Sequence, residues 1–136
     1  MDILTQAEQQ VAFKAASDIH QDWRENYIKN NGNIPRIKPT RDGYESNINV
    51  PFIELLPEFQ EMNIMMTQYV VKLLKMNNYT IDEIFYNIHE YWLELNPFAK
   101  NTNLDVPFNQ LSVIEQDKDI RVYNIVLGYY LSIVNS

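Results

Sequence analysis

The sequence predicts a mainly α-helical fold with short β segments, built from two tandem repeats of a helix–loop–short strand–helix unit. Four long segments carry apolar residues at three- and four-residue spacing, which is the pattern of amphipathic helices. The motif Ile-His-x-x-Trp occurs at residues 19–23 and again at 88–92. The motif Val-Pro-Phe-x-x-Leu follows it each time, at residues 50–55 and 106–111, so one order of motifs is used twice.

The first copy starts with a helix, expected from about Thr5 to Asn30. Asn-Gly-Asn at residues 31–33 is a natural stop signal for it. Residues 34–49 contain prolines and a glycine, and this predicts a loop with at most short extended pieces. Val-Pro-Phe at residues 50–52 predicts a short edge strand, where proline is tolerated.

Three further helices are expected after this loop. One begins at Pro57, since proline fits the first turn of a helix, and ends near the Asn-Asn pair at residues 77–78. The next begins after Thr80, whose side chain forms a capping box with the glutamate that follows, and it ends before Pro97. The last helix is expected from about residue 117 to 134.

The length of 136 residues fits a single domain that contains both copies. Repeat 1 covers about residues 5–78 and repeat 2 about residues 80–136, and a pseudo-twofold axis is expected to relate them. The second copy is shorter between its Trp and its Val-Pro-Phe, so it lacks a counterpart of the charged loop around residues 36–44. A duplicated scaffold in which only the first copy carries a charged loop suggests a single asymmetric binding site.

Composition excludes several classes of function. There is no cysteine, so disulfides, thiolate catalysis and cysteine-ligated metals are excluded. The net charge of −7 argues against binding a nucleic-acid polymer. Apolar runs are too short to span a membrane, and no secretory signal is seen, so a cytoplasmic protein is expected. The glycines are isolated, which excludes a phosphate-binding or dinucleotide glycine motif.

The motifs of the first copy suggest a family. They are an Ile-His-x-x-Trp helix, a glycine, a Pro-x-Arg-Asp turn, a Val-x-Phe-x-x-Leu-Pro segment and an Asn- and Met-containing start of the next helix. The residues that carry them are Ile19, His20, Trp23, Gly32, Pro39, Arg41, Asp42, Val50, Phe52, Leu56, Pro57, Asn63, Met66, Thr67, Lys72 and Leu73. Over residues 15–81 the chain resembles the repeat of the ryanodine receptor, the RyR domain. The second copy keeps the His-Trp and Val-x-Phe motifs but lacks the Pro-x-Arg-Asp turn.

The resemblance implies a tandem pair of mostly helical repeats that is not an enzyme. It also implies a module that binds an adenine nucleotide between the repeats. Carried over to this chain, Trp23 and Trp92 flank the base, Arg41 meets phosphate and Asn63 is a polar contact.

The chemistry of the charged loop adds two further candidates for ligand binding. Lys38 supplies a point charge, and Tyr44 supplies a ring and a hydroxyl. The alternative for this loop is a solvated turn in which Asp42 pairs with Arg41. The alternative for Trp23 and Trp92 is that each packs inside its own half, because aromatic residues at helical spacing usually belong to a core.

His20 and His89 are expected to be structural residues, each bonding a backbone carbonyl. Duplication favours this, because a catalytic residue is rarely needed twice. No spacing typical of a metal site accompanies either histidine, and no paired nucleophile is seen, so neither a metal nor a catalytic residue is expected.

Three hypotheses for function follow. The first is a non-enzymatic, cofactor-free module that binds a nucleotide-like ligand between the repeats, for example a viral protein that sequesters a nucleotide immune signal in the host cytoplasm. The second is a protein-interaction module that receives a basic partner segment. The third, ranked last, is a phosphoester hydrolase acting through His20 or His89.

Overall fold

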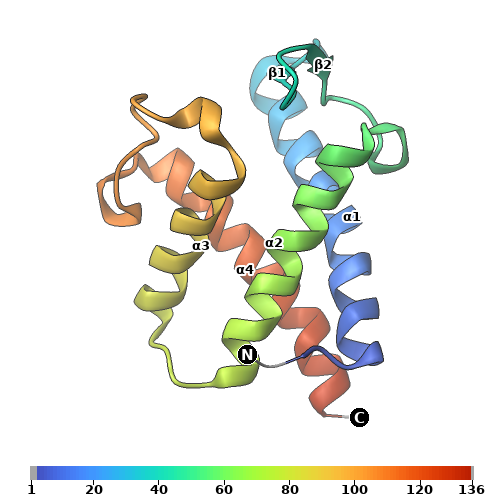
Figure 1. Ribbon diagram of the computed structural model, residues 1–136, viewed down its shortest axis with the longest axis vertical. Coiled ribbons are helices and arrows are strands. Elements are labelled where there is room, and N and C mark those ends of the chain that lie inside the picture. Colours follow the sequence, from blue (N-terminus) through green and yellow to red (C-terminus); the bar gives the residue numbers. More distant parts are fainter. Residues whose placement is uncertain (1–2, 136) are drawn as a thin grey trace.

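Helices account for most of residues 3–135, which are the residues described by the computed structural model. The long ones are α1 (Gln6–Asn31), α2 (Pro57–Met76), α3 (Ile81–Leu95) and α4 (Val113–Val134), shown in Figure 1. Two strands, β1 (Ile37–Pro39) and β2 (Glu45–Asn47), pair antiparallel in the loop after α1. Three short 3-10 turns are η1 (Phe52–Glu54), η2 (Pro97–Ala99) and η3 (Phe108–Gln110). The prediction of a mainly helical fold with short β segments is confirmed.

Local sequence signals place the starts of the helices. The side chain of Thr5 accepts a hydrogen bond from the backbone N–H of Glu8, and the Glu8 side chain accepts one from the N–H of Thr5. Thr80 and Glu83 repeat this capping box at the start of α3. The start of α4 was predicted too late, near residue 117. Its true cap is Ser112, whose hydroxyl oxygen accepts from the N–H three residues on, so the helix begins at residue 113.

The Val-Pro-Phe segments are not edge strands, so that prediction is wrong. In each copy the proline is extended and the next residues form a 3-10 turn, η1 or η3. Leu55 N–H donates to the Phe52 carbonyl oxygen at 3.1 Å, and Leu111 N–H donates to that of Phe108 at 3.1 Å. No other strand pairs with these segments in the described residues, so short local hydrogen bonds satisfy their backbone instead.

The core lies where α1, α2, α3 and α4 meet. Val70, Ile88 and Val126 are completely buried there. Alanines on α1 let α2 approach closely, and the Thr67 hydroxyl of α2 donates to the Ala12 carbonyl oxygen at 2.7 Å. A smaller apolar cluster lies under η1 and contains Leu55, Phe59 and Met62. None of the helices within residues 3–135 combines the length and the apolar character needed to cross a bilayer.

The first and last helices are tied together by polar contacts. The Arg121 guanidinium donates two hydrogen bonds to the Asp22 carboxylate, at 2.8 and 2.7 Å. Asp18 lies one turn before Asp22 on α1, and it accepts a hydrogen bond from the Tyr129 hydroxyl of α4. In Figure 1 the pair α1 and α2 and the pair α3 and α4 diverge toward the end that carries the β hairpin, while the α2–α3 link lies at the opposite end. The molecule is therefore joined along its length and parted at one end.

Candidate functional site

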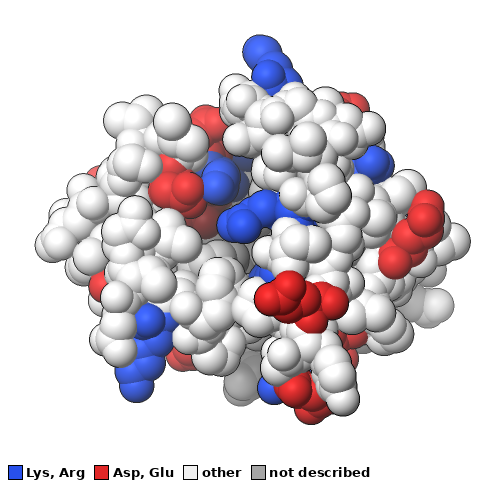
Figure 2. Space-filling model, turned by 90° about the horizontal axis from the view of Figure 1, so that it is seen from above, with Lys and Arg blue, Asp and Glu red and all other residues white. Residues whose placement is uncertain are grey.

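A cleft of about 860 Å³ opens between the two halves. Its first wall consists of α1, β1 and the start of α2, and its second wall consists of α3, the segment after it and the start of α4. Figure 2 shows the face onto which the halves part, with lysine and arginine side chains gathered around the central hollow. The cleft therefore joins a largely apolar interior to a charged mouth.

Each wall of the cleft carries one stacked histidine–tryptophan pair. The ring centroids of His20 and Trp23 are 5.7 Å apart with planes inclined by 17°. The centroids of His89 and Trp92 are 5.9 Å apart with planes inclined by 12°. Both indoles are half-buried and both line the cleft. The tryptophans are thus neither sealed in separate cores nor fully exposed, and their faces are supported by the histidines beneath them.

The histidines hold the walls in place through backbone contacts. His20 Nε2 lies 2.7 Å from the Val50 carbonyl oxygen, and His89 Nε2 lies 2.9 Å from that of Leu104. A carbonyl only accepts, so each Nε2 carries the hydrogen and donates it. Burial lowers the pKa of His20, although the bond to Val50 opposes this effect. Each histidine therefore fastens its helix to the chain just ahead of a 3-10 turn, as expected for a structural role.

Lys38 reaches across the mouth of the cleft. Its Nζ lies 5.2 Å from the ring centroid of Phe59 in the first half and 5.6 Å from that of Phe98 in the second. Both distances are within the range of cation–π contacts. Burial, with the nearby Arg36, lowers the pKa of Lys38 to about 8, while Glu58 opposes this. The ammonium group is therefore held against aromatic faces rather than against an acid.

Two other lining cations are held by acids. Arg121 is bonded to Asp22, and Lys118 Nζ lies 2.9 Å from Glu115 Oε1. These pairs are partly exposed and neutralise much of the charge around the second wall. Positive charge is therefore most available on the hairpin side of the cleft, at Lys38 and at the neighbouring Arg36, which also lines it.

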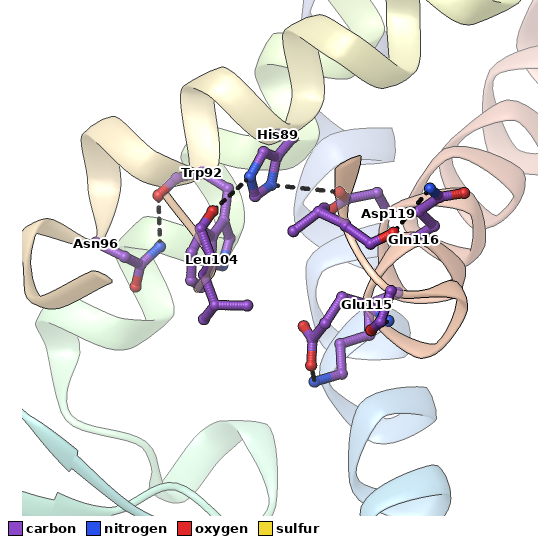
Figure 3. Close-up of polar contacts among 10 residues, drawn as sticks. His89, Trp92, Asn96, Leu104, Glu115, Gln116 and Asp119 are labelled. Carbon is purple, nitrogen blue, oxygen red and sulfur yellow. Dashed lines mark hydrogen bonds and ion pairs between the residues drawn. The ribbon is translucent and has the colours of Figure 1, made fainter. Parts of the chain in front are cut away.

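The second wall holds a buried acid, Asp119 of α4. Its Oδ2 lies 3.6 Å from His89 Nδ1, which is too long for a hydrogen bond (Figure 3). Burial raises the pKa of Asp119 to about 7; Glu115 adds to this and Lys118 opposes it. Among the described residues, Asp119 Oδ2 has no hydrogen-bond partner. Asp119 therefore belongs to the lining of the cleft and keeps one buried oxygen without a hydrogen-bond partner.

Asn96 supplies a second unused acceptor. It follows the last residue of α3, and its Nδ2 donates to the Trp92 carbonyl oxygen at 2.8 Å. Its Oδ1 is buried and has no hydrogen-bond partner in residues 3–135. Figure 3 shows Asn96 and Asp119 on the same wall, with Trp92 between them. The second wall thus contains two buried acceptor oxygens without partners, in residues on either side of Trp92.

The structure brings most of the sequence-predicted residues together. Trp23, Trp92, Lys38 and Asn63 all line the cleft, as do both histidines. Arg41 and Tyr44 do not line it, because they lie in the exposed turn between β1 and β2. The backbone N–H of Arg41 donates to Glu58 Oε2 at 3.1 Å, which fixes this turn against the start of α2.

Sequence reasoning missed Asp119, Asn96 and Phe98. A signal existed for Asp119, because aligning the two Val-Pro-Phe segments pairs it with Asn63. Asn96 and Phe98 lie in the segment where the copies differ in length, so no counterpart pointed to them.

No cluster of three or more potential metal ligands exists among residues 3–135. Models of known protein families give no match to the chain, and neither does a search of curated proteins.

Proposed function

We propose that this chain is a non-enzymatic binding protein for a nucleotide or a nucleotide-derived signal, held in the cleft between two RyR-like repeats related by a pseudo-twofold. The observation that carries the proposal is the placement of Trp23 and Trp92, one from each half, in the lining of one cleft. Binding without turnover lowers the free concentration of a ligand. The proposal therefore includes sequestration of a nucleotide immune signal, as a viral protein in host cytoplasm would achieve it.

The size and lining of the cleft support a small aromatic ligand. Small-molecule sites typically enclose roughly 300–1,000 Å³ and are mostly apolar with a few polar groups. Stacking of a base on an aromatic side chain contributes about 1–3 kcal/mol. Lys38 at the mouth supplies a cation suited to phosphate. A nucleotide combines these two requirements in one molecule.

Repeated local contacts support the two-repeat relationship. Each copy has a threonine capping box, a histidine bonded to a backbone carbonyl and a 3-10 turn after Val-Pro. Gln60 donates to the Leu55 carbonyl oxygen at 3.0 Å, and Gln116 donates to that of Leu111 at 3.0 Å. Contacts of this kind are too specific to arise from helix packing alone, so they favour a duplicated unit.

The geometry of His89 favours binding over hydrolysis. A general base needs a ring nitrogen within hydrogen-bond reach of the group that it deprotonates. His89 Nε2 donates to Leu104, and Nδ1 faces Asp119. Nε2 is therefore used in a bond to the backbone, and the almost completely buried Nδ1 side of the ring faces a second protein group, which supports a structural role.

The test is intrinsic tryptophan fluorescence together with thermal unfolding, across a panel of mononucleotides, cyclic dinucleotides and ADP-ribose derivatives. The chain has two tryptophans, and both line the cleft. We expect saturable quenching and a melting temperature that rises with ligand concentration. The Trp23→Leu variant should lose at least tenfold in affinity.

Two variants of the β hairpin sharpen this test, because each removes one positive charge. Lys38→Gln removes a cation that lines the cleft, and Arg41→Gln removes one outside it. We expect weaker binding for Lys38→Gln and little change for Arg41→Gln. If no compound in the panel changes fluorescence or melting temperature, the nucleotide proposal is wrong, and basic peptides become the ligands to test.

A further inference from the structure

The acid in the second wall is unusual for a site that would hold a phosphate-bearing ligand. Asp119 is 8% exposed, and its Oδ2 is the atom left without a hydrogen bond. A buried acceptor without a donor is unfavourable, because it has given up its hydrogen bonds to water. An atom of this kind in the lining of a cleft indicates that a ligand supplies the donor.

The neighbouring acceptor narrows the chemistry of the ligand. Asn96 is 3% exposed, and its Oδ1 is likewise without a partner in the described residues. Asp119 and Asn96 lie on either side of Trp92 (Figure 3). A flat ring stacked on this indole would therefore meet acceptors, and it would need N–H groups at its edge.

Nucleobases differ in the N–H donors that they carry at their edges. Guanine carries a ring N–H beside an exocyclic amino group, so its edge presents adjacent donors. In adenine the amino group is flanked by ring nitrogens that only accept. Acceptor oxygens on the protein suit the adjacent donors of guanine. An ionised carboxylate would repel the ring nitrogens of adenine.

Building on the proposed nucleotide binding, we propose that Asp119 and Asn96 form a base-reading subsite that selects a guanine-type base through its N–H groups. In this arrangement Asp119 Oδ2 accepts one N–H of the base and Asn96 Oδ1 accepts another. The base lies against the second wall, and the phosphate lies toward Lys38 on the hairpin. The ligand is then held in one orientation.

The two copies support a single orientation. Aligning the Val-Pro-Phe segments pairs Asp119 with Asn63, so the first wall carries a neutral amide where the second carries an acid. Lys38 belongs to the β hairpin of the first half, and the shorter second copy forms no hairpin in the residues that the structure describes. The acceptor oxygens and Lys38 therefore belong to opposite walls.

Binding to this subsite should depend on pH. The titratable or charged groups around Asp119 are His89 on α3 and Glu115 and Lys118 on α4; Asp22, His20 and Lys38 line the cleft from the first half. The pKa of Asp119 is raised to about 7, so much of the free protein carries a protonated acid at neutral pH. Accepted N–H groups stabilise the ionised form. Ionisation of Asp119 should therefore raise the affinity as the pH increases through about 7, and the rise should level off near pH 8, where Lys38, with its pKa lowered to about 8, loses part of its charge.

The experiment is isothermal titration calorimetry of GMP, IMP and AMP between about pH 6 and about pH 8. IMP keeps the ring N–H of GMP but lacks the exocyclic amine. We expect GMP to bind at least tenfold more tightly than AMP, with IMP between them. We also expect the GMP affinity to fall severalfold at the acidic end of the range.

Two variants assign the effect to Asp119. Asp119→Asn should lose both the preference for GMP and the pH dependence, because its side chain neither ionises nor accepts as strongly. Glu54→Gln removes an exposed carboxylate that does not line the cleft, and it should keep both properties. If Asp119→Asn fails to fold, the ratio of GMP to IMP and AMP affinity in the unmodified protein decides.

Failure of this subsite is distinguishable from failure of the proposed function. If AMP binds as tightly as GMP, or if Asp119→Asn keeps the preference and the pH dependence, the subsite is overturned while nucleotide binding stands. If no nucleotide binds at all, both proposals are overturned.

Discussion

The two halves of the molecule share their anchors and differ in their cleft walls. In both halves a histidine bonds a backbone carbonyl and stacks under a tryptophan. The first half then adds a β hairpin with Lys38, whereas the second adds a shorter segment and places Asp119 against the cleft. The parts that hold the helices together are thus repeated, and the parts that face the cleft are not. This difference separates residues needed for folding from residues available for recognition.

The largest expected effect comes from breaking the shared anchors. Replacing His20 or His89 by alanine leaves a partly buried carbonyl without its donor and creates a cavity under an indole. Each variant should lose about 3 kcal/mol in free energy of unfolding, measured by urea denaturation. Gln21→Ala, an exposed neighbour on α1, serves as control and should be near neutral. Unequal losses for the two histidines would show that the anchors are not equivalent.

The next effect tests the acid that the second half alone carries. The pKa of Asp119 is raised to about 7 in the folded protein, above its value of about 3.9 when unfolded. The folded state therefore binds more protons between these values, and stability falls as pH rises from about 4 to about 7. Asp119→Asn removes this loss and should raise the free energy of unfolding by on the order of 2 kcal/mol near pH 8.

Chemical denaturation of both proteins at about pH 5 and about pH 8 checks this prediction. The gain from Asp119→Asn should be small at the acidic pH and larger at the basic one. An equal effect at both values would mean that Asp119 is not a desolvated acid. Glu54→Gln is the control, because that glutamate is exposed and does not line the cleft.

The smallest effect concerns the contact that joins the halves. Asp22→Asn weakens the paired hydrogen bonds from Arg121 between α1 and α4. Both side chains are partly exposed, so the loss should be only about 1 kcal/mol in free energy of unfolding. Asp117→Asn removes the more distant acid, 3.6 Å from Arg121 on the same helix, and should cost less. A larger loss for Asp117→Asn would contradict this ranking.

Most of the fold was predictable because its signals are local. Capping boxes at Thr5 and Thr80, and Pro57 at a helix start, act through neighbouring residues. The Val-Pro-Phe error arose because a strand is defined by a pairing partner, which no local pattern reveals. The late start assigned to α4 arose because residues 113 and 114 are apolar and yet exposed, and so hide the cap at Ser112.

The site was predictable only where it repeats or carries a motif. Trp23, Trp92, Lys38 and Asn63 were found and do share a cleft. Arg41 was grouped with Lys38 by sequence, but alternation in the hairpin and its tight turn direct the two to different surroundings. Asp119 was missed because what sets it apart is a buried oxygen that accepts no hydrogen bond. This property depends on packing between helices that are far apart in the chain.

The contact between Asp22 and Arg121 also bears on how the molecule folds. It joins residues 99 positions apart in the chain, whereas His20–Val50 and His89–Leu104 close loops of 30 and 15. Closing a longer loop costs more conformational entropy, so short-range contacts are favoured early in folding. We therefore expect each half to collapse around its own histidine first and α1 to dock on α4 last. The cleft would then be the latest feature of the native state to form.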